Sequence, residues 1–154
     1  MIAVIQRVYN ATVYADGVLS GSIGEGLYIL LGVASGDTVS DADALAQKIS
    51  KLRIFTDEND KMNLSVKDID GEALVVSNFT LNANYAHRNR PDYLNSAPPE
   101  LANELYGYFT KQLSQLVRKC ETGVFGADMR TEMTTNGPVT IVMDSSVLLR
   151  KDKH

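Results

Sequence analysis

Gly137 and Pro138 are the residues whose types and spacing say most about the chemistry of this chain. Residues 129–134 and 139–144 on either side are rich in Met, Thr, Val and Ile, so the pair is expected at a strand-to-strand connection. Glycine adopts backbone angles that are closed to other residues, while proline lacks an N–H and makes a cis peptide bond accessible. Such a turn can hold bare carbonyl groups against a ligand. Rigid carbonyls reject a group by its shape, which is one way to read chirality.

A second motif, Ser77-Asn78-Phe79-Thr80, follows the apolar run of residues 73–76. A strand that ends in Ser-Asn and resumes with Phe-Thr-Leu can point consecutive N–H groups into a pocket. If they face an ester carbonyl, the N–H groups of Phe79 and Thr80 form an oxyanion hole. In other enzymes the removal of one such donor costs about 3–4 kcal/mol. Ser77 to Thr80 are therefore the predicted catalytic residues.

Other hydrolytic machinery is sparse. The two histidines are His87, in an expected loop, and His154 at the terminus, and no Cys-x-x-Cys or His-x-x-x-His spacing indicates a zinc site. The hydroxyl of Thr80 lacks the free α-amine that activates N-terminal threonine nucleophiles. We therefore expect electrostatic and positional catalysis without metal or cofactor, and a Thr80-dependent esterase stays an alternative.

Composition indicates one globular domain. The 154 residues include 44% hydrophobic and 22% charged residues, and no apolar run approaches the length of a membrane span. The opening strand pattern leaves no room for a signal peptide, and the single Cys120, expected near a helix end, excludes an internal disulfide. A cytoplasmic protein is predicted.

The net charge of −4 predicts a small footprint on any nucleic acid, because proteins that grip long stretches of phosphate backbone are usually basic. Only local basic groups would meet phosphates. These groups are Arg88, Arg90, Lys111, Arg118 and Lys119.

The element pattern is that of a mixed α/β domain with two main helices. Strands are predicted at residues 2–14, 18–23, 28–33, 121–124, 129–134 and 139–143, with an Asp-Gly hairpin signal at Asp16-Gly17. One helix is expected to begin near Ser40, and the second at Pro98-Pro99. Residues 151–154 are typical of a frayed tail.

Taken together, the motifs resemble those of the D-aminoacyl-tRNA deacylase family, and the similarity runs in order from residue 1 to about residue 144. The supporting segments are residues 1–8, 24–27, 52–55, 61–65, 89–91, 98–101 and 123–129. The resemblance implies one deacylase domain at 1–144 with a C-terminal tail at 145–154. It also implies a homodimer whose curved, barrel-like mixed sheet has two main helices packed on one side.

The resemblance further implies the substrate and its contacts. The ester joins a D-amino acid, or glycine, to the 3′-terminal adenosine of tRNA, and the neighbouring ribose 2′-OH assists hydrolysis. Gly137-Pro138 resembles a Gly-cis-Pro element that enters the partner subunit's site and excludes L-side chains, with Arg7 holding that loop. Phe125 and Met129 match apolar contacts to the terminal adenine.

Two departures from the family pattern stand out. Asn78 occupies a position where the family usually has Gln, and residues 84–87 replace a stretch that often contains Gly and Lys. Two other functions stay open on the sequence. A related editing deacylase would remove a small L-amino acid if the Gly-Pro bond were trans, and a non-catalytic nucleic-acid-binding protein would use the dimer as a platform.

Overall fold

The first strand organises the sheet of this computed structural model, which describes residues 1–150. Strand β1 (Ile2–Ala15) pairs along nearly its whole length with β8 (Met129–Asp144). Its other edge pairs with β3 (Gly26–Gly32) and then with β2 (Val18–Ile23). Asp16 and Gly17, which join β1 to β2, both have positive φ, so the predicted Asp-Gly hairpin is confirmed.

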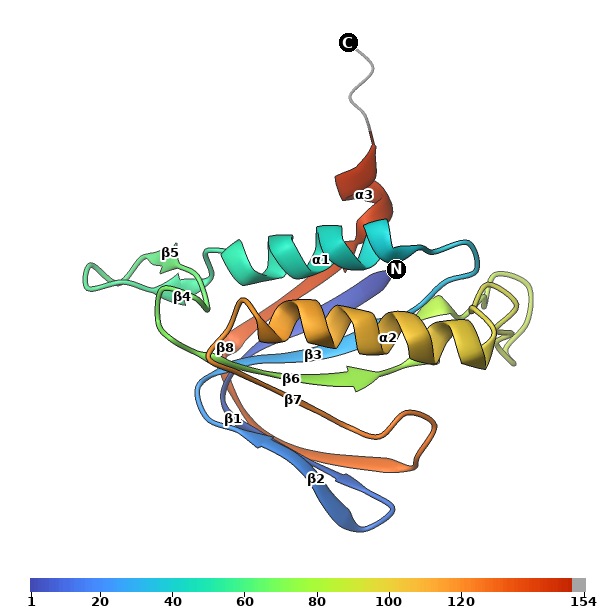
Figure 1. Ribbon diagram of the computed structural model, residues 1–154, viewed down its shortest axis with the longest axis horizontal. Helices are drawn as coiled ribbons and strands as arrows, with labels where there is room; N and C mark the ends of the chain where they lie inside the picture. Colours follow the sequence, from blue (N-terminus) through green and yellow to red (C-terminus); the bar gives the residue numbers. More distant parts are fainter. Residues whose placement is uncertain (151–154) are drawn as a thin grey trace.

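Two parallel pairings extend the sheet. β3 pairs with β6 (Glu72–Ser77), and β6 pairs with β7 (Lys119–Thr122). At the far side, Ser20 Oγ donates to the Thr122 carbonyl at 2.8 Å and Lys119 Nζ to the Ser22 carbonyl at 2.9 Å. The sheet therefore curls into a nearly closed, barrel-like shape (Figure 1). The predicted mixed α/β domain with a curved sheet is confirmed.

Helices α1 (Val39–Lys51) and α2 (Pro99–Ser114) lie side by side against one face of the sheet (Figure 1). A capping box formed by Thr38 and Asp41 starts α1, so the helix begins one residue before the predicted Ser40. The apolar faces of both helices pack on β3 and β6. The largest side chains buried there are Phe109, Leu113, Leu45, Ile49, Ile29 and Leu31.

The chain adds a third, short helix, α3 (Ser145–Leu149), to the two that were predicted. Ser145 is fully buried, and its hydroxyl donates to Asp41 Oδ1 at 2.7 Å. The first part of the expected tail is therefore packed against α1. The frayed end predicted at 151–154 lies outside the described residues.

A small hairpin stands apart from the main sheet. It consists of β4 (Phe55–Thr56) and β5 (Met62–Leu64), and the Asp57 carboxylate accepts hydrogen bonds from backbone N–H groups within its turn. Neither this hairpin nor the pairing of β3 with β6 was predicted. Within residues 1–150, no helix is both long and apolar enough to cross a membrane.

Candidate active site

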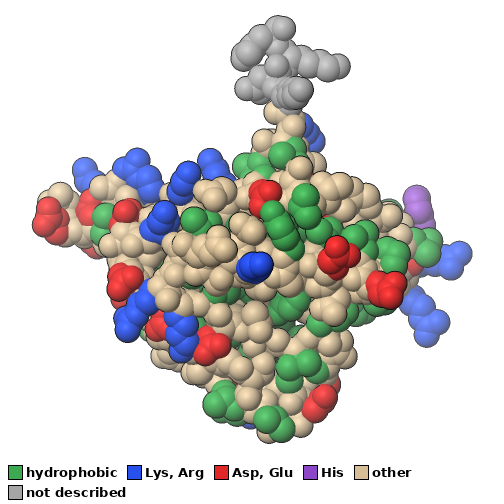
Figure 2. All heavy atoms as spheres, viewed as in Figure 1, with side chains coloured by type: hydrophobic (Ala, Val, Ile, Leu, Met, Phe, Trp, Pro, Cys, Tyr) green, Lys and Arg blue, Asp and Glu red, His purple; other side chains and the backbone are tan. Residues whose placement is uncertain are grey.

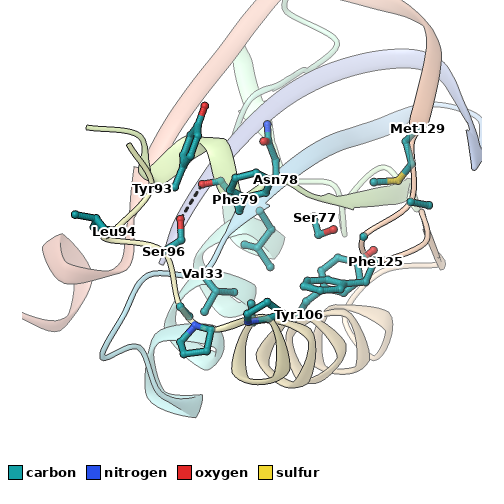
Figure 3. A pocket seen from close by; sticks show the side chains of 17 residues that line it. Val33, Ser77, Asn78, Phe79, Tyr93, Leu94, Ser96, Tyr106, Phe125 and Met129 are labelled. Carbon is teal, nitrogen blue, oxygen red and sulfur yellow. Dashed lines mark hydrogen bonds between the residues drawn. The ribbon is translucent and has the colours of Figure 1, made fainter. Parts of the chain in front are cut away.

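A cavity of about 730 Å³ opens where β6 ends and α2 begins (Figure 3). Pockets of 300–1,000 Å³ are typical for small-molecule ligands. Its floor is Leu31 near the end of β3 and Val33 just after that strand, and Ala102 and Tyr106 of α2 form one wall. The remaining lining residues are Ser77, Asn78, Phe79, Tyr93, Leu94, Ser96, Ala97, Pro98, Pro99, Phe125, Gly126, Ala127 and Met129.

Ser77, Asn78 and Phe79 of the Ser-Asn-Phe-Thr motif line this cavity, whereas Thr80 does not. The strand does not resume after Asn78 as predicted, because residues Phe79–Asn82 form a short 3₁₀ helix, η1. Asn78 caps it, and its Oδ1 accepts a hydrogen bond from the Thr80 N–H at 3.2 Å. Asn side chains compete in this way with strand hydrogen bonding. Among the described residues, the Phe79 N–H has no hydrogen-bond partner.

The turn around η1 is tied to its neighbours on three sides. The Asn78 N–H donates to the Leu31 carbonyl at 2.8 Å, and the buried Asn82 amide donates to the Val33 carbonyl at 3.0 Å. Ser96 Oγ donates to the Phe79 carbonyl at 3.2 Å, shown by the dashed line in Figure 3. These bonds fix the orientation of the Phe79 peptide group before any ligand binds.

The apolar wall contains both residues that were predicted to contact adenine. Phe125 and Met129 line the cavity, and the Phe125 ring lies 6.1 Å from the ring of Tyr106. The Tyr106 hydroxyl donates to the Val75 carbonyl at 2.9 Å. Sequence reasoning missed Tyr106, although a tyrosine within an otherwise leucine-rich helix face is a signal for a hydrogen bond at its buried tip.

No side chain that lines the cavity is an Asp, Glu, His, Lys, Arg or Cys, within the described residues. Burial raises the pKa of Tyr106 to about 12, so its phenol stays neutral near pH 7 and does not act as a base. His87 lines a separate, smaller hollow. Residues 1–150 also hold no cluster of His, Cys, Asp or Glu that could bind a metal ion. The polar groups at this cavity are therefore the Phe79 N–H and neutral side chains such as those of Ser77, Asn78 and Ser96.

Gly137-Pro138 is not the turn between two strands that was predicted, because β8 runs unbroken through it. The register with β1 shows why. Gln6 pairs with Thr140 and Val8 with Thr135, so β8 has extra residues opposite Arg7 that form a bulge. Within the bulge the Gly137-Pro138 peptide bond is cis and Gly137 has a φ of +141°.

Arg7 holds this bulge in place. Its Nε donates to the Asn136 carbonyl at 3.0 Å and its Nη2 to Asn136 Oδ1 at 3.3 Å. Nη1 donates to the Ile54 carbonyl at 2.7 Å and to Thr56 Oγ1 at 3.5 Å. Only 8% of the arginine is exposed, and the planar guanidinium is suited to bridging several acceptors at fixed angles. The bulge, its arginine and β4 therefore form one rigid unit, which we call the Arg7 cluster.

Within one chain, the Arg7 cluster and the cavity lie apart. Arg7 pairs with Leu27, which pairs with Ala73 near the start of β6, whereas Ser77 ends that strand. The separation is four residues along the strands and three strands across, or roughly 13 Å by 14 Å. Neither Gly137 nor Pro138 lines the cavity. The two predicted parts of the site are therefore not brought together by a single chain.

The matches to known proteins span both motifs. The sequence profile of the family described as D-Tyr-tRNA(Tyr) deacylase matches residues 4–144. The chain belongs to this family. A D-aminoacyl-tRNA deacylase of Caldicellulosiruptor saccharolyticus is 52% identical over 145 residues, covering 94% of this chain and 97% of that protein. A protein of the same name from Persephonella marina is 53% identical over 148 residues, covering 96% and 100%.

Solved structures show that the backbone fold is similar as well. A structure described as c-Myc DNA Unwinding Element Binding Protein has a TM-score of 0.88 and 38% identity, covering 94% of this chain and 98% of that one. A second structure, described as a probable eukaryotic D-amino acid tRNA deacylase, has a TM-score of 0.80 at 13% identity and shares the fold. The match to the family thus spans residues 4–144, which include both predicted motifs.

Proposed function

We propose that this protein is a D-aminoacyl-tRNA deacylase, which hydrolyses the ester between a D-amino acid, or glycine, and the 3′-terminal adenosine of tRNA. The observation that carries the proposal is a cavity with an unpaired Phe79 N–H and no ionisable base, in a chain of the deacylase family. Such a site can polarise an ester carbonyl but cannot itself activate water, so the substrate has to contribute to the chemistry.

In the proposed mechanism, the ester carbonyl oxygen accepts a hydrogen bond from the Phe79 N–H. The Thr80 N–H becomes a second donor when the Asn78 side chain turns away from it. These donors stabilise the negative charge that develops on the oxygen as water attacks. The ribose 2′-OH beside the ester orients the attacking water, and the bond between the carbonyl carbon and O3′ breaks as a proton from that water passes to O3′. Phe125 and Met129 pack against the adenine, where aromatic and sulfur groups make favourable contacts with a base.

Chirality is read in this proposal by a second copy of the chain. Gly137 and Pro138 of one subunit reach the cavity of its partner, where their carbonyls face the amino-acid Cα and leave no room for an L-side chain. The sheet register supports a contribution from a partner, because one chain alone separates the two motifs. The rigid support that Arg7 gives to the bulge suits a part that rejects by shape. The enzyme is proposed to act as a cytoplasmic homodimer.

The primary test is hydrolysis of D-Tyr-tRNA and L-Tyr-tRNA by the purified protein. We expect release of D-tyrosine and little release of L-tyrosine, and equal rates on both substrates would end the chiral proposal. L-Ala-tRNA should be included, because its selective hydrolysis would identify an editing deacylase for a small L-amino acid. Salt-sensitive binding of duplex DNA without hydrolysis would favour the nucleic-acid-binding alternative.

Subunit complementation tests the shared site. Phe79→Pro removes the donor N–H at the first residue of η1, a position where proline is tolerated, and Gly137→Ala disturbs the bulge. Phe79→Pro alone is expected to be inactive, and Gly137→Ala alone is expected to lose its preference for D- over L-Tyr-tRNA. In a mixed dimer the one active site combines an unmodified cavity with an unmodified bulge, so the D-over-L preference should be restored. No recovery in dimers shown to be mixed would place both motifs in one chain's site.

A further inference from the structure

A loop beside the cavity carries exposed basic side chains that have no role in the proposed reaction. Residues 83–95 leave η1, project from the end of the molecule and return to α2 (Figure 1). Between Glu72 and Asp92 the sequence has no acidic residue, yet it has His87, Arg88 and Arg90, all exposed. Figure 2 shows the histidine and basic side chains together at this end. A cationic projection on a chain with a net charge of −4 calls for an anionic ligand.

These cations are available for an external ligand. Within residues 1–150, His87, Arg88 and Arg90 form no ion pair and no hydrogen bond to another side chain or carbonyl. His87 and Arg88 line a hollow of about 330 Å³ together with Asn84, Asp92 and Leu94, and Leu94 also lines the larger cavity. The hollow and the cavity therefore adjoin at Leu94.

Exposed rings lie among these cations. The Tyr85 side chain is 79% exposed, and Phe79 is 59% exposed at the cavity mouth, where its ring meets that of Tyr93 edge-on at 4.9 Å. Exposed rings beside basic groups are the combination that binds single-stranded nucleic acid, since rings stack on bases and cations meet phosphates. Paired RNA would not offer its base faces to such a surface.

The loop is held in shape at its base. Asn84 and Asp92 exchange two backbone hydrogen bonds of 2.8 and 3.0 Å, and the Asn84 side chain donates to the Asp92 carboxylate at 3.4 Å. The Asp92 carboxylate also accepts from the Leu94 N–H at 3.3 Å. These bonds fix the base of the loop beside the cavity, so the exposed residues between 84 and 92 lie where a strand would enter.

We propose that loop 83–95 binds the unpaired 3′ nucleotides of tRNA that precede the terminal adenosine, with Arg88 and Arg90 on their phosphates and Tyr85 stacked on a base. This inference rests on the proposed function, since it assumes that the terminal adenosine occupies the cavity. It explains how an acidic protein binds RNA. Contact is confined to a few nucleotides at one basic projection, and the rest of the tRNA is left untouched.

Two substrates separate this contact from the reaction. D-Tyr-tRNA has the phosphates, whereas D-tyrosyl-adenosine has the same ester and nucleoside without them. With Arg88→Ala/Arg90→Ala we expect KM for D-Tyr-tRNA to rise about tenfold at low salt, with kcat and the hydrolysis of D-tyrosyl-adenosine unchanged. The slope of log kcat/KM against log salt should fall by about 1.4, for two contacts to a single strand. Equal effects on both substrates, or none on either, would overturn the inference.

Matched variants test the specificity of the effect. Lys48→Ala/Lys51→Ala removes two exposed cations at the end of α1 and should leave KM for D-Tyr-tRNA unchanged. Tyr85→Phe should retain RNA affinity, and Tyr85→Leu should lose at least about fivefold because stacking requires a ring. If the two lysines matter as much as the two arginines, general charge rather than the loop is responsible, and the inference fails.

Binding without catalysis distinguishes failure of the inference from failure of the proposed function. The probe is a fluorescein-labelled acceptor-stem hairpin with a four-nucleotide single-stranded 3′ end, compared by anisotropy with the same hairpin made blunt. Preference for the overhang that is lost in Arg88→Ala/Arg90→Ala supports the inference even if D-Tyr-tRNA is not hydrolysed, which would refute only the function. Hydrolysis by a protein that binds both probes equally would refute only the inference.

Discussion

At the cavity, the Phe79 N–H has no hydrogen-bond partner among residues 1–150. In the Arg7 cluster, by contrast, every nitrogen of the guanidinium donates a hydrogen bond. The first region has room and a free donor, but neither Gly137 nor Pro138 lines it. The second has a rigid element but no cavity of its own. In the proposed function each region is half of a site, because the cavity binds the ester and the Arg7 cluster selects the D-amino acid.

The largest effect is expected from Arg7→Ala. Its loss leaves carbonyl groups of Ile54 and Asn136 without their donor in a buried setting, so the free energy of unfolding should fall by about 3 kcal/mol. Denaturant unfolding measures this, and D- against L-Tyr-tRNA hydrolysis should show weakened discrimination. Arg7→Lys should be only partly better, because an ammonium cannot reproduce the planar fork. Full discrimination in Arg7→Ala would mean that the bulge needs no support.

Gly137→Ala tests the bulge by adding a single Cβ atom. A Cβ at Gly137 would lie 2.5 Å from the Val139 N and 2.9 Å from its Cγ2, at a φ of +141° that other residues rarely adopt. We expect a loss of about 1–3 kcal/mol in the free energy of unfolding and a lower D-over-L ratio. Gly107→Ala is the control, because nothing lies within 4 Å of its Cβ and alanine should stabilise α2 by about 1 kcal/mol. An equal loss of unfolding free energy in both variants would mean that a Cβ at residue 137 causes no particular strain.

Thr80 tests whether the cavity acts through its backbone. Thr80→Val keeps the N–H and removes the hydroxyl that donates to Asn78 Oδ1, so kcat on D-Tyr-tRNA should fall by no more than about tenfold. Thr80→Ser retains the hydroxyl and serves as the control. A drop of about a thousandfold with Val but not with Ser would assign the hydroxyl as nucleophile, since the loss of a catalytic nucleophile is far larger than the loss of one hydrogen bond.

The smallest effect is expected at Cys120, which belongs to neither region. Burial raises the pKa of its thiol from 9.0 to about 12, so at pH 8 the folded chain should react with iodoacetamide about a thousandfold more slowly than the unfolded chain. Because the folded state holds the proton more tightly, this contribution to stability is complete below pH 9 and is lost as the pH rises toward 12. Cys120→Ala should leave deacylation unchanged, and rapid alkylation of folded protein would disprove the assigned burial.

Sequence reasoning predicted most strands and both main helices. It also named residues that lie in the cavity and in the Arg7 cluster, and their roles there stay predictions. It failed where a side chain overrides a local pattern. Gly137-Pro138 indicates a strand end, but both flanks pair with β1 because Arg7 satisfies the bulge from across the sheet, a contact 129 residues away in sequence. Likewise, the Asn78 side chain turns the expected strand into η1. The cavity wall at Tyr106 depends on how α2 packs on β6, which no local motif encodes.

The closure of loop 83–95 at Asn84 and Asp92 also has a consequence for evolution and for engineering. Because the chain is fastened there, the segment between them can be replaced or lengthened without shifting Tyr93 or Ser96 at the cavity. If the loop binds RNA as proposed, swapping this tip between relatives would change that contact while the Arg7 cluster stays as it is.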